Sequence, residues 1–141
     1  CNGKIPDKGN LVSVDQLLLN NAYSLYENSL EFMNNYQIQA YLNSVFDVIS
    51  ETNKYFSDEK PWELEKENPE RMQTILWVTC EVLRIVSILL QPVITESSNK
   101  LLDFLNVDLD ERFFKYLNSD FSLKSGIEIH EPNVIFPKID L

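Results

Sequence analysis

Few side chains in this sequence are spaced for catalysis or for metal binding. The single histidine, His130, has no second histidine or cysteine at ligand spacing and no partner nucleophile, so we expect a surface residue rather than a metal ligand or a catalytic base. Carboxylates gather at Asp108, Asp110 and Glu111, but a short helix should begin there, and negative charge at that end stabilises the helix dipole. The three glycines are too isolated to form a phosphate-binding loop. The sequence therefore predicts no active site and no metal site.

One stretch could bind a ligand without catalysing a reaction. NKYFSDEKPWELEK, residues 53–66, places Trp62 directly after Pro61 and among charged side chains. The residues leave two interpretations open. Either the indole fills the space between helix ends, with Pro61 beginning a short helix, or the proline holds a flat aromatic platform at a rim where helices meet. Stacking of one unpaired base on such a platform contributes about 1–3 kcal/mol.

The elements that would position these residues are helices. Ser13 and Gln16 form a capping box ahead of the first helix, and Asn68-Pro69 begins the third. Apolar spacing at steps of three and four predicts helices over residues 14–33, 38–56 and 69–91, a fourth that continues through Leu101, Leu102 and Leu105, and a short one over 109–117 capped by Asp108.

The third helix is the most apolar and should lie at the centre of the fold, because apolar side chains occupy most of its sides. Only Glu81 and Arg84, an i,i+3 pair, mark a strip that we expect to face water. After the last predicted helix the helical period is lost, and prolines interrupt an extended pattern. We therefore expect a single all-α domain over residues 1–141, an antiparallel helix bundle (1–117) with an extended C-terminal tail (118–141).

The charge balance limits how this chain could bind nucleic acid. A formal net charge of −10, from 22 acidic and 12 basic residues, opposes a protein that grips nucleic acid mainly through its phosphates. Residues 57–70 hold six acids against two lysines, a local charge of −4 around Trp62. This acidity does not exclude a protein that stacks on, and reads, a few unpaired bases.

The cysteines and the first residues indicate the cellular context. Cys1 and Cys80 lie far apart in the sequence, which suits reduced thiols in a cytoplasm better than a disulfide framework. No uninterrupted apolar run reaches the roughly 18 residues that a membrane span needs. The chain opens on CNGKIP, without an initiator methionine or a signal peptide, so we expect a cytoplasmic fragment of a longer protein.

Three segments, in order and in register, resemble one family. Residues 53–66 contain NKY, PWEL and a following lysine, which is similar to the N-x-Y…K-P-W-x-L-x-K signature in the C-terminal helical domain of methionyl-tRNA synthetases. Residues 83–107 resemble the family segment L-R-x-x-x-x-L-L-x-P-x-x-P-E-T-x-x-K. EPNVIFPKID, residues 131–140, resembles the family ending E-P-x-x-L-F-P-R-I-(D/E).

The resemblance implies a role in tRNA recognition. Members of this family are class Ia aminoacyl-tRNA synthetases, which attach an amino acid to its tRNA with ATP and Mg²⁺ in a catalytic domain of the same polypeptide; we expect that domain, and any cofactor, to be absent from this segment. Their helix bundle binds the anticodon loop of methionine tRNA and recognises CAU. By position, Trp62 is expected to stack on an anticodon base and Pro61 to shape the same wall, while Asn53 and Tyr55 hold the helix junction. The family's other anticodon-reading residues, an Asn and an Arg, would lie on a helix before residue 1.

Two alternatives stay open. The bundle is shared across class Ia synthetases, so the chain would also suit another member of that class, although the Pro-Trp motif and the FPKID ending favour methionine. The acidity instead favours a helical protein-interaction module with no RNA role. An exposed Trp62 beside a concave surface would count against that module, and a Trp62 buried on all sides would support it.

Overall fold

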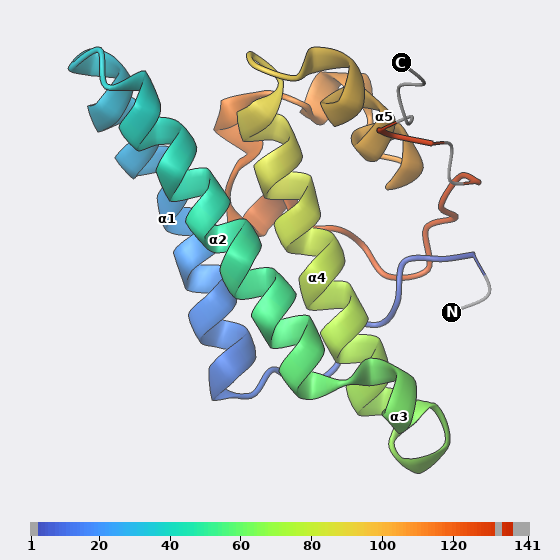
Figure 1. The fold of residues 1–141 in the computed structure, drawn as a ribbon. Helices are drawn as coiled ribbons and strands as arrows, with labels where there is room; N and C mark the ends of the chain where they lie inside the picture. The colour runs from blue at the N-terminus through green and yellow to red at the C-terminus, as the bar shows by residue number, and fades with distance from the viewer. Residues whose placement is uncertain (1–2, 132–133, 137–141) are drawn as a thin grey trace, which may run out of the picture.

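The computed structural model describes residues 3–131 and 134–136, and that part of the chain folds into five α-helices. They are α1 (Ser13–Asn34), α2 (Ile38–Glu59), α3 (Pro61–Glu67), α4 (Pro69–Leu90) and α5 (Thr95–Phe104), followed by 3₁₀ turns at Leu109–Glu111, Phe114–Tyr116 and Ser119–Phe121. The long helices α1, α2 and α4 alternate in direction, and each packs against the other two (Figure 1). The predicted all-α antiparallel bundle is confirmed.

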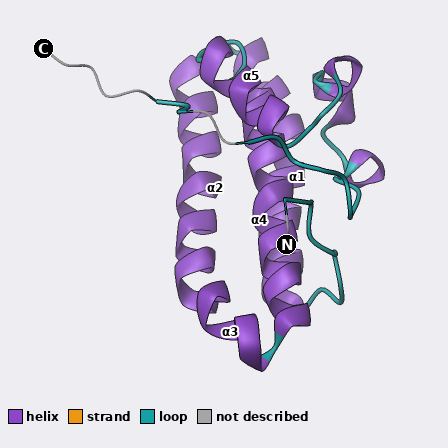
Figure 2. Cartoon of the chain, turned by 90° about the vertical axis from the view of Figure 1, so that its right-hand side faces the viewer, coloured by secondary structure: helices purple, strands orange, loops and turns teal. Residues whose placement is uncertain are grey.

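The central helix is α4, as its apolar composition predicts. Ile75, Val78, Ile85 and Leu89 on this helix are completely buried. By length and composition α4 could cross a membrane, but 72% of its apolar window is buried inside the fold, as in the core helix of a globular protein. Figure 2 shows α2 and α4 side by side, with the short helix α3 joining them at one end of the bundle.

The predicted helix ends are mostly confirmed. The bounds of α1, α2 and α4 agree with the periodicity to within three residues, and the Asn68 side chain caps α4 by accepting a hydrogen bond from the Arg71 amide at 3.1 Å. The predicted capping box of Ser13 and Gln16 is wrong. Helix α1 begins after Val12, whose amide donates to the Asp15 carboxylate at 2.9 Å. Asp15 caps the helix start in place of Gln16. Its carboxylate is held there by Tyr55 of α2 and Arg71 of α4, and a local sequence motif does not include these distant partners.

The expectation that Glu81 and Arg84 face water is also wrong. Their side chains are 0% and 2% exposed and form an ion pair at 2.6 Å. The C-terminal segment covers this side of α4: the Leu123 amide donates to Glu81 Oε2 at 2.9 Å, and Arg84 Nη1 donates to the Tyr116 carbonyl at 2.9 Å. The ion pair and these two backbone hydrogen bonds together offset the cost of burying the two charges.

The predicted helix over 109–117 is wrong as well. The segment forms two separate 3₁₀ turns, and the Asp108 side chain does not cap the first. Arg112 lies between the turns and donates to the Val107 carbonyl and to Asp103, which bends the chain away from a continuous helix. The described part of the following tail begins with the 3₁₀ turn at Ser119–Phe121 and then lies beside the N-terminal segment, where the Ile5 amide donates to the Ile127 carbonyl at 2.8 Å.

Candidate nucleic-acid interface around Trp62

The corner between α2 and α3 is a sharp turn made by one residue. Helix α2 ends at Glu59, and Lys60 adopts the left-handed conformation with φ 43°. The amide of Lys60 donates to the Phe56 carbonyl at 3.2 Å, and its carbonyl accepts from the Glu63 amide at 2.9 Å. Pro61 then occupies the first position of α3, where its fixed φ suits a helix and its missing N–H costs nothing. A short helix that begins at Pro61, which belonged to the first of the two interpretations of this stretch, is present.

Trp62 projects from this corner into solvent. Its side chain is 56% exposed, whereas an indole that fills the space between helix ends would be buried. One side of the ring rests on Phe56 of α2, with ring centroids 5.8 Å apart and planes inclined by 52°. Pro61, directly before it, is buried. The indole thus contacts one aromatic neighbour, while more than half of the residue is accessible to solvent.

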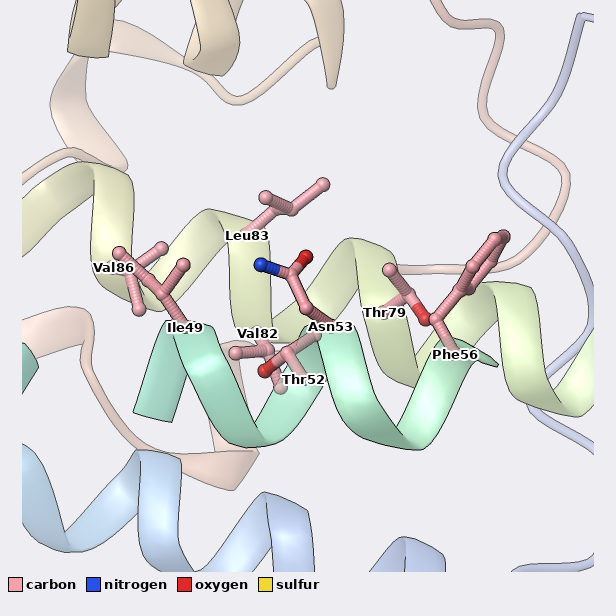
Figure 3. A pocket seen from close by; sticks show the side chains of 8 residues that line it. All are labelled: Ile49, Thr52, Asn53, Phe56, Thr79, Val82, Leu83 and Val86. Atoms are coloured by element: carbon pink, nitrogen blue, oxygen red, sulfur yellow. The ribbon is translucent and has the colours of Figure 1, made fainter. Parts of the chain in front are cut away.

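A shallow groove of about 200 Å³ runs between α2 and α4, and Phe56, which contacts Trp62, lies at one end of it (Figure 3). Four residues from each helix line it: Ile49, Thr52, Asn53 and Phe56 on α2, and Thr79, Val82, Leu83 and Val86 on α4. Its walls are mostly apolar, and Phe56 belongs both to the groove and to the support of Trp62. The tryptophan therefore lies at the rim of a concave surface.

The two other motif residues, Asn53 and Tyr55, point in different directions from α2. Tyr55 is buried and donates its hydroxyl to Asp15 Oδ1 at 2.7 Å, so it links α2 to α1. Burial and this hydrogen bond raise its pKa above the ordinary value. Asn53 is exposed, and its amide extends over the groove toward α4 (Figure 3). One of the pair is packed into the helix junction and the other borders the candidate interface.

Three charged residues near the corner, Asp15, Glu59 and Arg71, are connected by hydrogen bonds that no short sequence motif indicates. Arg71 in the first turn of α4 donates to both oxygens of Asp15, at 2.5 and 2.8 Å, and also to Glu59 at 2.6 Å. We call Asp15, Tyr55, Glu59 and Arg71 the corner cluster. Burial opposes ionisation of Asp15, but the hydrogen bonds from Arg71, Tyr55 and the Val12 amide outweigh it and hold the pKa of this carboxyl below its usual value. The cluster joins the start of α1, the end of α2 and the start of α4.

The amino-acid pattern does carry a signal for Asp15. The residue occupies the position three before Leu18 and four before Leu19, on the face of α1 that is otherwise apolar and buried. An acid in a core-facing position must find a cation or hydrogen-bond donors, because an unpaired buried charge is costly. The position of Asp15 in the apolar face therefore indicates a buried polar cluster, although it does not identify the partners.

The surface around Trp62 is acidic. Lys60 pairs with Glu63 at 3.3 Å, and both side chains are about half exposed. With six acids and two lysines in residues 57–70, this surface repels phosphates. The interface can therefore offer stacking and edge contacts rather than charge neutralisation.

Comparison with known proteins identifies the family. Residues 5–140 match the sequence profile described as the anticodon binding domain of methionyl tRNA ligase. The methionine–tRNA ligases of Rhizobium meliloti and Mesorhizobium japonicum are 41% and 37% identical over 138 residues, which cover 98% of this chain and 27% of each relative. The apo crystal structure of Mycobacterium tuberculosis methionyl-tRNA synthetase superimposes with a TM-score of 0.93 at 32% identity, over 99% of this chain and 29% of that chain. The chain thus spans little more than a quarter of the curated relatives' length, and it belongs to the family of methionyl-tRNA ligase anticodon-binding domains.

Proposed function

We propose that this domain recognises the CAU anticodon of methionine tRNAs and that an unstacked anticodon base lies on Trp62. The supporting observation is the position of Trp62: exposed, backed by Phe56 and at the rim of the α2–α4 groove. Pro61 is buried, so it shapes this wall through the backbone rather than by contact with RNA. Tyr55 supports the helix junction from inside through its hydrogen bond to Asp15, whereas Asn53, which was expected to do the same, borders the groove.

The acidity of the surface limits how binding is achieved. Stacking contributes about 1–3 kcal/mol per base and does not require basic side chains. Phosphate contacts need Lys or Arg, and the segment around Trp62 has an excess of four negative charges. Base contacts here therefore supply specificity, while basic surfaces elsewhere in the complete ligase hold the tRNA backbone.

Under this proposal, the aminoacylation reaction takes place outside this chain. The complete cytoplasmic ligase attaches methionine to its tRNA with ATP and Mg²⁺, and its catalytic domain is the intramolecular partner of this bundle. The bundle itself recognises the anticodon loop so that the correct tRNA is presented.

The proposal is tested by the affinity of the full-length ligase for anticodon stem-loops. Dissociation constants are measured for a CAU loop and for loops with one changed anticodon base, with wild type, Trp62→Ala and Phe113→Ala. Phe113 is a matched control, because its ring is 58% exposed and it lies outside α3. We expect Trp62→Ala to weaken CAU binding about 5- to 150-fold, the range that loss of one stacked base corresponds to. Equal affinities for all loops, or equal losses in Trp62→Ala and Phe113→Ala, would refute the proposal.

A further inference from the structure

The helix that bears Trp62 is short, and apart from Pro61 and the partly buried Leu64, which packs against the core, its side chains lie at the surface. Of the seven residues of α3, only Pro61 is buried. A single residue, Lys60, connects α3 to the end of α2, and a single residue, Asn68, connects it to the start of α4. Besides the contacts of Pro61 and Leu64, the position of Trp62 therefore depends on where α2 ends and where α4 begins.

The corner cluster fixes both of these points. Glu59, the last residue of α2, accepts a hydrogen bond from the Arg71 guanidinium at 2.6 Å. The backbone amide of Arg71 donates to the Asn68 side chain, the residue on which α3 ends and α4 is capped. Arg71 Nη1 also donates a hydrogen bond to Asp15 Oδ2 of α1. One arginine thus ties the two attachment points of α3 to the bundle.

Neither Asp15 nor Arg71 is placed to touch RNA bases. The Asp15 side chain is 0% exposed and the Arg71 side chain 16% exposed. Arg71 binds both oxygens of Asp15 and one oxygen of Glu59 through the planar fork of its guanidinium; a lysine ammonium on a flexible stem does not reproduce that bidentate geometry. The shape of the side chain, and not only its charge, holds the ends of α2 and α4 together.

We infer that Arg71 and Asp15 are positioning residues for anticodon recognition, which set the place of Trp62 at the rim of the groove and thereby the affinity for CAU. This inference rests on the function proposed above. It adds two residues, on α1 and α4, that lie outside the Pro-Trp motif. A small displacement of α3 moves the indole away from Phe56 and from the position that a base must reach, so affinity falls without loss of any direct contact.

The test compares two arginines of the same helix in the full-length ligase. Arg71→Lys keeps the charge and removes the double hydrogen bonding, while Arg84→Lys makes the same change in the cluster around Glu81, away from α3. Affinity for the CAU stem-loop and the thermal unfolding midpoint are measured for both. The ¹⁹F signal of 5-fluorotryptophan at position 62, assigned by its loss in Trp62→Phe, reports the environment of the indole.

We expect Arg71→Lys to weaken CAU binding tenfold or more and to shift or broaden the Trp62 signal. Arg84→Lys should leave the CAU affinity within twofold of wild type and should move the Trp62 signal by less than its linewidth. Glu59→Gln, a milder change to the same cluster, should give a smaller loss in the same direction. Equal losses in Arg71→Lys and Arg84→Lys, or an unchanged Trp62 signal in Arg71→Lys, would overturn the inference. If Trp62→Ala itself leaves CAU binding unchanged, the proposed function fails instead, so the two failures are distinguishable.

Discussion

Phe56 and Trp62 contact each other across the one-residue turn between α2 and α3, with ring centroids 5.8 Å apart and planes inclined by 52°. This tilted contact covers one side of the indole and leaves 56% of the residue exposed. The same phenylalanine lines the end of the α2–α4 groove. A single aromatic pair therefore connects the exposed platform to the concave surface, and it is the structural basis of the proposed anticodon site.

The support that Phe56 gives to Trp62 is open to a direct test. Aromatic pairs contribute about 0.5–1.5 kcal/mol beyond the area that they bury. Phe56→Leu keeps an apolar side chain in the groove but removes the ring, so we expect CAU affinity to fall about 2- to 12-fold. Stem-loop binding measures this. An unchanged affinity, with Trp62→Ala impaired, would show that the platform does not depend on its neighbour.

Lys60 should be a point of backbone strain. It is a non-glycine residue at φ 43°, where a side chain crowds the following carbonyl and glycine does not. Its exposed contact with Glu63 adds little stability. We therefore expect Lys60→Gly to raise the free energy of unfolding by about 0.5–1 kcal/mol. Urea unfolding checks this, and Lys60→Val, which should destabilise, is its control.

Asp15 should make part of the stability depend on acid pH. Its pKa in the folded chain lies below the ordinary 3.8, so its contribution is complete above that pH and is lost as the pH falls through the lower folded value. We expect Asp15→Asn to be much less stable than wild type at pH 7 and the difference to narrow below about pH 4. A stability difference that stays constant between pH 7 and pH 3 would contradict this assignment.

The buried pair of Glu81 and Arg84 should be sensitive to removal of one partner. Arg84→Met leaves the Glu81 carboxylate in the core with no cation, and we expect a loss of about 3–5 kcal/mol in the free energy of unfolding. Lys100→Met removes the partner of Glu96 in an exposed pair, where solvent screens the charges and we expect little or no loss. Denaturant unfolding of both variants measures the difference. Similar losses would mean that Arg84 is not the essential counter-charge of Glu81.

The fold was largely predictable because its main signals are local. Helix α4 begins at Asn68-Pro69, and the apolar spacing of α1, α2 and α4 reports which faces are buried without any knowledge of partners. The wrong prediction for Glu81 and Arg84 concerns burial that segments distant in the sequence determine. Glu81 and Arg84 look like an exposed strip until the segment around Tyr116 and Leu123 covers them.

The candidate site was predictable in part. The motif identifies the residue pair Pro61-Trp62. The exposure of Trp62, however, depends on how α2 and α4 pack against each other, and no local pattern predicts that packing. Arg71 gave no signal on its own, because its two partners lie 56 and 12 residues away in sequence. The motif thus located the platform, and only the packing revealed what holds it.

The most direct test of the central claim is the ¹⁹F spectrum of 5-fluorotryptophan-labelled full-length ligase, titrated with a CAU stem-loop and with a loop of changed anticodon. Trp77 is 1% exposed and its indole donates to the Leu123 carbonyl, so its signal serves as an internal reference. We predict that the Trp62 signal moves with CAU, moves far less with the altered loop, and that the Trp77 signal stays in place. A Trp62 signal that responds to neither loop, or equally to both, would contradict the assignment of Trp62 as the base-stacking residue of the anticodon site.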